Sequence, residues 1–188
     1  MERSLDEILV EQCAPTLVGI KPASLFRCRA DGGRCPAEAV ERWRRELGPR
    51  GIAIRVLKTC PATGACMVYL YRPAWMAHLV ADPAVRAFLC CRGYGLSMDL
   101  EDMLEELSGR FCLEEEYPHE IGVFLGYPLE DVEGFIRHRG HGFTACGCWK
   151  VYGDPRAARL RFDRYRRCTA ACRRRFLAGT PIAALAAG

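Results

Sequence analysis

The sequence predicts an α+β fold, in which helices cover a small, mostly antiparallel sheet and the last helix is long. Three observations predict this. Residues 52–57 and 67–71 are rich in β-branched and aromatic side chains and flank a turn containing Pro61 and Gly64, as in a β-hairpin. Most other segments have the apolar spacing of amphipathic helices. Strands and helices do not alternate as in a doubly wound fold.

Length and composition are those of an ordinary globular protein. The chain has 188 residues, of which 50% are hydrophobic and 27% are charged, and this composition excludes a disordered chain. No apolar run approaches the roughly 18 residues of a membrane helix. We therefore expect a single domain over residues 1–188 with no membrane span.

The first element is expected to be a helix with a capping box. Ser4 is the cap and Glu7 reaches back to it. The helix should run to about Gln12, because Pro15 and Gly19 follow and break helices. A short strand over 24–29 comes next, then a loop at 31–33.

The remaining elements follow from periodicity and helix start signals. Pro36 opens a helix to about Leu47, and the hairpin of 52–57 and 67–71 follows it. The C-terminal half is expected to be mostly helical, over residues 73–80, 83–91, 100–107, 129–137 and 155–177. Residues 117–126 fit a strand or a buried helix, and residues 143–152 fit an extended segment.

Charge and cysteine content bear on compartment and partners. Lys plus Arg is 27 and Asp plus Glu is 23, so the net charge of +4 is too small to indicate nucleic acid. Acidic residues stand near the start, where an export signal would be basic and then apolar, so we expect a cytoplasmic protein. The twelve cysteines are then free thiols, either core filler or reactive groups.

Metal binding is one possible use of the cysteines. The close pairs lack the Cys-x-x-Cys spacing of a zinc knuckle; they are Cys90/Cys91, Cys146/Cys148 and Cys168/Cys172. Cys172 lies on the apolar stripe of the last long helix, so packing explains it more simply. His138 and His141 precede Cys146 and Cys148 and leave a loosely spaced His/Cys site open. The cofactor stays unknown.

Other residues have the chemistry of a catalytic centre. His119 beside Glu120 offers a general base and a carboxylate, although neighbouring side chains on a strand point to opposite faces. Cys13 and Cys148 are candidate nucleophiles, and Lys150 near a thiol would lower the pKa of that thiol.

Two segments of opposite charge suggest a surface for a partner. Nine arginines lie between Arg156 and Arg175, and nine acidic residues lie between Asp99 and Glu120. The arginine helix lacks the interleaved aromatic residues of a nucleic-acid surface, so nucleic acid is disfavoured as a partner. A protein partner through either segment stays open.

Several sequence blocks together resemble one known family. The blocks are Cys13–Leu17 (Cys-Ala-Pro-Thr-Leu), Ser24–Phe26, Tyr69–Pro73, Pro118–Pro128 (Pro-His-Glu-Ile-Gly-Val-Phe-Leu-Gly-Tyr-Pro), Asp131–Val132, Gly134–Phe135 and Cys148–Tyr152. They resemble a bacterial domain-of-unknown-function family of clostridia and other anaerobic Firmicutes. Members of that family are encoded near flavodoxins and ferrous-iron uptake components. The resemblance therefore implies a cytoplasmic protein linked to iron or redox physiology, and it supplies no catalytic residues.

Together these observations favour a cytoplasmic accessory factor of iron or redox metabolism that acts through thiols or a bound cofactor. The candidate site residues are Cys13, Lys21, His119, Glu120, Cys148 and Lys150, which we expect to converge in one site. Two alternatives stay open: a small enzyme with a Cys or His–Glu centre, and a protein or nucleic-acid interaction module that uses the arginine-rich helix.

Overall fold

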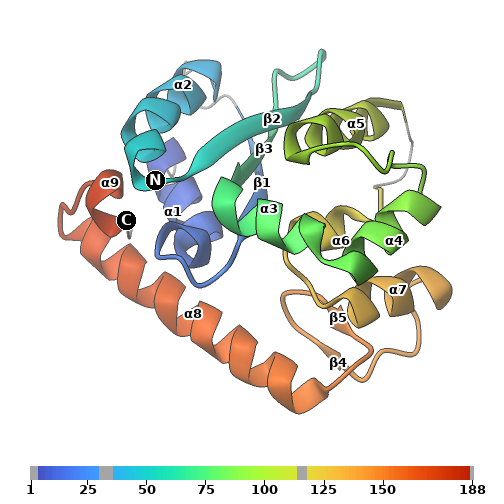
Figure 1. Ribbon diagram of the computed structural model, residues 1–188. Coiled ribbons are helices and arrows are strands. Elements are labelled where there is room, and N and C mark those ends of the chain that lie inside the picture. Colours follow the sequence, from blue (N-terminus) through green and yellow to red (C-terminus); the bar gives the residue numbers. More distant parts are fainter. Residues whose placement is uncertain (1–3, 30–35, 114–117, 187–188) are drawn as a thin grey trace. The chain divides into compact units, whose positions relative to one another are not determined.

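The computed structural model describes residues 4–29, 36–113 and 118–186, with the side chains of 112 and 113 left out. Its contacts divide the chain into two compact units. Unit 1 comprises residues 1–76 and 168–188, and unit 2 comprises residues 77–167. Helices and one antiparallel sheet make up unit 1, and unit 2 is mostly helical, so the α+β prediction is confirmed (Figure 1).

Unit 1 is built on a three-stranded antiparallel sheet. Its strands are β1 (Ala23–Cys28), β2 (Ala53–Thr59) and β3 (Cys66–Tyr71), in the order β1-β3-β2. The predicted hairpin is confirmed as β2 and β3, with Ile54 opposite Leu70. The loop expected at residues 31–33 lies outside the described residues.

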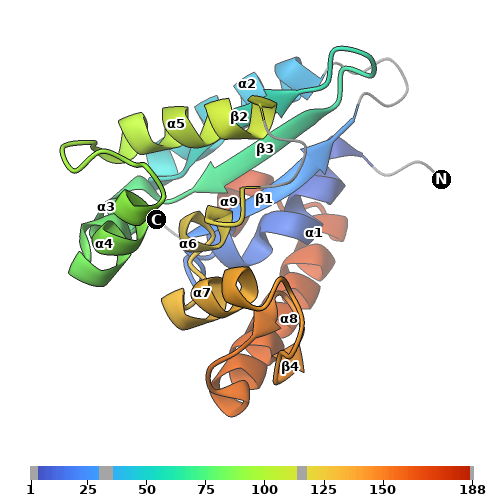
Figure 2. The ribbon, with the colours of Figure 1, turned by 90° about the vertical axis from the view of Figure 1, so that its right-hand side faces the viewer.

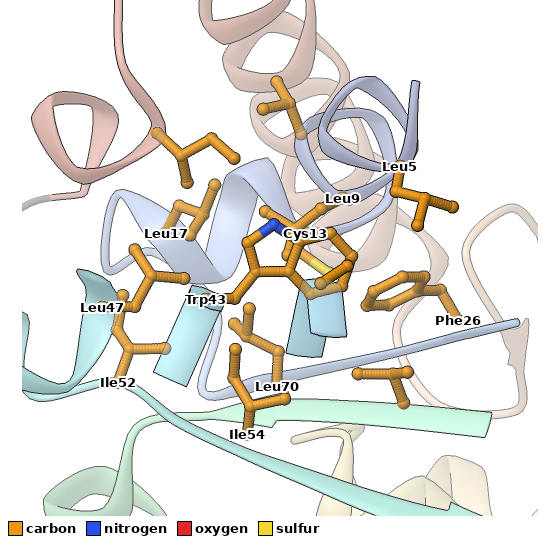
Figure 3. Close-up of a cluster of buried hydrophobic side chains, with 14 of the residues drawn as sticks. Leu5, Leu9, Cys13, Leu17, Phe26, Trp43, Leu47, Ile52, Ile54 and Leu70 are labelled. Carbon is orange, nitrogen blue, oxygen red and sulfur yellow. The ribbon is translucent and has the colours of Figure 1, made fainter. Parts of the chain in front are cut away.

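Helices α1 (Leu5–Leu17) and α2 (Pro36–Leu47) cover one face of this sheet, and a short helix η1 (Gly48–Arg50) follows α2. The C-terminal helix α9 (Ile182–Leu185) packs on both α1 and α2. Alternate residues of the strands pack into the cluster between sheet and helices, as in a half-buried strand; they are Phe26, Cys28, Ile54, Val56, Cys66, Val68 and Leu70. Figure 3 shows this cluster, with Trp43 in the middle and Leu9, Leu17 and Leu70 around it.

The first helix differs from its prediction. Ser4 caps it, with its hydroxyl oxygen accepting a hydrogen bond from the Glu7 amide at 3.1 Å. The Glu7 carboxylate does not reach back; it lies 3.7 Å from the Arg173 guanidinium. The helix also continues through Pro15 to Leu17, because the residues of its last turn are all buried and tertiary packing outweighs the missing amide donor.

Unit 2 contains the second half of α3 (Pro73–Ala81), then α4 (Pro83–Cys91), α5 (Leu100–Leu113), α6 (Ile121–Phe124) and α7 (Leu129–Arg137). A two-stranded hairpin follows, formed by β4 (Ala145–Cys146) and β5 (Lys150–Val151). Figure 2 shows α6 next to α7, and the two helices are in contact. The ambiguous segment 117–126 thus contains a short helix at residues 121–124, and residue 117 lies outside the described residues. The segment 143–152 is extended only at the hairpin strands.

The last long helix, α8, spans Pro155–Leu177 as predicted, and the boundary between the units falls within it. The Asp154 side chain accepts a hydrogen bond from the Arg156 amide at 2.8 Å and so caps the helix. In the part of the chain that the structure describes, no helix combines the length and apolar character needed to cross a membrane.

The packing of unit 1 makes a quantitative prediction. Leu9 is fully buried in the cluster of Figure 3, so Leu9→Ala should remove about 2–5 kcal/mol from the free energy of unfolding. Leu177→Ala is the control, because Leu177 is 63% exposed and its truncation should cost less than about 0.5 kcal/mol. Urea unfolding of both variants measures the difference, and equal losses would contradict the assignment of this core.

Candidate functional site

A cavity of about 300 Å³ lies within unit 2. Its walls come from the start of α6, from α7 and from the β4–β5 hairpin. The lining residues are mostly apolar or aromatic, with a few polar groups among them; those used below are His119, Tyr127, Asp131, Phe135, Cys146, Cys148, Trp149 and Lys150. Such a mixture is typical of small-molecule sites.

A buried carboxylate on α7 holds the hairpin in place. Asp131 is 3% exposed. Its Oδ2 accepts a hydrogen bond from the Trp149 indole at 2.7 Å, and its Oδ1 accepts bonds from the Tyr152 and Gly153 amides at 2.6 and 2.8 Å. Three donors around one carboxylate satisfy a buried charge that would otherwise be costly.

Glycines allow the elements around the cavity to approach closely. A Cβ on Gly134 of α7 would lie 2.4 Å from the Tyr152 ring, and one on Gly147 would lie 2.3 Å from the Phe162 ring. A Cβ on Gly122 of α6 would meet Val132 of α7 at 2.7 Å. Side chains at these positions would force α7, the hairpin or α8 to shift.

Aromatic rings form two walls of the cavity. The Tyr127 and Trp149 rings stack with centroids 4.7 Å apart and an interplanar angle of 25°. Phe135 meets the His119 ring edge-on at 5.0 Å. Burial raises the pKa of the Tyr127 phenol to about 12, and the nearby Cys148 thiol adds to the shift, so the phenol stays protonated and donates to the Cys148 carbonyl at 3.3 Å.

Lys150 supplies the cationic group of the cavity lining. Its ammonium donates to the Gly140 carbonyl at 2.8 Å and lies 5.6 Å from the Phe135 ring centroid and 5.2 Å from that of Phe143. Among the described residues no carboxylate forms an ion pair with it. An ammonium has three donors, so two remain for a ligand.

Three of the predicted site residues line this cavity: His119, Cys148 and Lys150. Glu120 does not. It is 5% exposed, and its Oε1 lies 3.0 Å from Arg110 Nη1 and accepts a hydrogen bond from the Tyr94 hydroxyl at 3.3 Å. His119 and Glu120 therefore have different environments, and the carboxylate is engaged with an arginine rather than with the histidine.

Cys13 and Lys21 belong to unit 1. The Cys13 thiol lies in the apolar cluster of Figure 3, and burial raises its pKa to about 12. Lys21 is close enough to oppose this rise through its charge, and Ser24 opposes it through a hydrogen bond. Because these two residues and the cavity residues lie in different units, one common site for all six stays a prediction.

Several cavity residues were not among the predicted site residues. They are Tyr127, Asp131, Phe135, Cys146 and Trp149. All of them except Cys146 stand in the sequence blocks that carry the family resemblance. Membership in those blocks was the signal that could have marked them as site residues. What the sequence lacked was a reason to treat aromatic residues and a lone aspartate as site residues rather than as core.

Several residues considered above as metal ligands or as a partner surface take part in packing or in ion pairs. Within the described ranges no three His, Cys, Asp or Glu side chains gather as a metal site requires. Cys172 is in the core of unit 1, and Cys168 packs against that core. On the arginine-rich helix, Arg166 pairs with Asp163, and Arg173 lies 3.1 Å from Glu11. Residues 114–116 of the acidic segment lie outside the described residues.

The three hydrogen bonds of Asp131 predict a large effect from a small change. In Asp131→Asn, one acceptor oxygen becomes an amide donor that faces another donor. The free energy of unfolding should therefore fall by about 1–3 kcal/mol. Glu133→Gln makes the same chemical change at an exposed position of α7 and should shift stability by less than about 0.5 kcal/mol. Thermal and urea unfolding test this pair, and a neutral Asp131→Asn would contradict the clamp.

Thiol reactivity in unit 1 should follow local environment. Hydrogen bonds from Thr63 and from the Thr63 and Ala62 amides lower the pKa of Cys60, so its reactive thiolate persists at lower pH than that of an ordinary cysteine. At neutral pH iodoacetamide should modify Cys60 and leave Cys13 intact until the protein is denatured. Peptide mapping measures both sites, and modification of Cys13 in the folded protein would be the contrary result.

Comparison with known proteins identifies a family. No curated protein and no solved structure matches the chain. Residues 9–186, nearly the whole chain, match the family described as Protein of unknown function (DUF3793). The chain therefore belongs to the DUF3793 family of proteins of unknown function.

Proposed function

We propose that this protein is a cytoplasmic accessory protein of redox metabolism, and that its unit 2 binds a small organic molecule with a planar ring and an anionic group. The observation that carries the proposal is the combination of aromatic walls, one lysine with spare donors and two exposed thiols around a single cavity. Each of these features restricts the ligand in a different way.

The aromatic walls favour a planar ring. Stacking on Tyr127 or contact with Phe135 gives a flat ligand the offset or edge-on geometry that aromatic pairs prefer. A volume of about 300 Å³ is at the lower end for small-molecule sites. The cavity therefore suits one ring system rather than a dinucleotide.

Lys150 favours a carboxylate or phosphate on that ring. Lys150 is half-buried, so a charge-assisted hydrogen bond there competes less with water than one at the surface. The Asp131 carboxylate also lines the cavity, but its oxygens are engaged by the Trp149 indole and two backbone amides. Lys150 is thus the group that would set the charge of the ligand.

The thiols support the redox part of the proposal. Cys146 and Cys148 are both exposed and both line the cavity, so a bound molecule would lie beside two exposed cysteines. Iron has less support, because the described residues contain no group of three ligating side chains.

Calorimetric titration with naphthoate and with its neutral amide, naphthamide, tests this function on the reduced protein. We expect saturable binding of naphthoate and weaker binding of naphthamide. Lys150→Met should lower the affinity for naphthoate by about tenfold or more, because a hydrogen bond to a charged group contributes roughly 1.5–3 kcal/mol. The preference for the anion should disappear in the same variant.

Lys58→Met is the matched control, since Lys58 is an exposed lysine on β2 of unit 1. It should bind naphthoate as the wild type does. Thermal unfolding of both variants checks that they are folded. Absence of saturable binding, or an equal loss in both variants, would overturn the proposed function.

A further inference from the structure

We infer that Cys146 and Cys148 form a reactive dithiol that reduces small aromatic disulfides bound in the cavity and closes to a Cys146–Cys148 disulfide. The aromatic and anionic character of the substrate rests on the proposed function. Ring closure itself rests on the geometry of the hairpin alone.

The hairpin carries both cysteines, two residues apart, at the lining of the cavity. Cys146 ends β4, and residues 147–149 form the bend that leads to β5. Gly147, between the two cysteines, is pressed against Phe162 of α8, where a Cβ would lie 2.3 Å from the ring. Gly147 and both neighbouring cysteines are exposed, and all three residues line the cavity.

The spacing permits a disulfide. Cα atoms two residues apart are at most roughly 7 Å from each other in a fully extended chain, and a bend brings them closer. Disulfides form with Cα atoms about 4.4–6.8 Å apart. Closure therefore needs side-chain rotation and a local change in the bend, not a rearrangement of helices.

The reaction balances without a further reactant. One thiolate of the pair attacks a sulfur of the substrate disulfide, whose S–S bond breaks and releases one small thiol. The second thiolate then attacks the mixed disulfide, and the second small thiol leaves. The protein dithiol is oxidised to one disulfide, the substrate is reduced to two thiols, and the two thiol protons of the protein pass to the products.

Six of the other described cysteines differ from this pair in burial or in geometry. Cys13, Cys28, Cys66 and Cys172 are buried. Burial raises the pKa of Cys28 to about 11, which further lowers its reactivity. Cys90 and Cys91 are also adjacent and at least partly exposed, but they are consecutive residues of α4, whose side chains diverge around the helix.

The experiment uses the full chain, reduced and handled without oxygen. The protein is treated with dithiobis(nitrobenzoate), an aromatic carboxylated disulfide, or with hydroxyethyl disulfide, which has neither ring nor charge. Free thiols are then blocked at low pH and the protein is digested with trypsin. Cleavage after Arg139 and Lys150 puts Cys146 and Cys148 in one peptide, and cleavage after Arg86 and Arg92 puts Cys90 and Cys91 in another.

With either reagent, we expect the peptide 140–150 to lose two hydrogens and carry no adduct, while the peptide 87–92 carries adducts or free thiols. In Cys146→Ser, Cys148 should retain a stable mixed disulfide, because the serine cannot displace it. Stable adducts on both cysteines of peptide 140–150, or two unreacted thiols in it, would overturn the inference.

A competition arm separates this inference from the proposed function. Naphthoate should slow the reaction of peptide 140–150 with dithiobis(nitrobenzoate) several-fold and leave peptide 87–92 unaffected. Ring closure without any effect of naphthoate would uphold the dithiol and count against the proposed ligand. Protection by naphthoate together with stable adducts on both cysteines of peptide 140–150 would uphold the proposed ligand and overturn the dithiol.

Discussion

The carboxylate of Asp131 is the constraint on which unit 2 depends most. It is buried on α7, and it accepts hydrogen bonds from the Trp149 indole and from two backbone amides just after β5. A hairpin whose strands have two residues each has little stability of its own. Through these bonds one side chain sets where the hairpin lies against α7, and hence the shape of the cavity.

Unit 1 contains a comparable interaction. Asp6, in the first turn of α1, accepts hydrogen bonds from the Trp43 indole at 2.7 Å and from Arg42, both on α2. In each unit an acidic side chain on one helix fixes a tryptophan from another element, so the largest ring takes a single orientation. In unit 1 the fixed indole completes an apolar core, whereas in unit 2 it forms a wall of a cavity.

Burial sorts the cysteines by the chemistry that they can perform. Burial in the core of unit 1 raises the pKa of Cys13 to about 12, so this thiol stays protonated and fills space. At the hairpin of unit 2, Cys146 and Cys148 are both exposed. The same residue type thus serves packing in one unit and offers accessible sulfur in the other.

The sequence by itself determined most of the secondary structure, because periodicity, caps and turn residues are local signals. The bounds of α2, α4, α7 and α8 and the β2–β3 hairpin follow from them. Only the tertiary structure decided that α1 continues through Pro15, that Glu120 pairs with Arg110, and that Asp131 accepts a hydrogen bond from the Trp149 indole. These outcomes depend on residues distant in the chain, whose packing and hydrogen bonds no local pattern records.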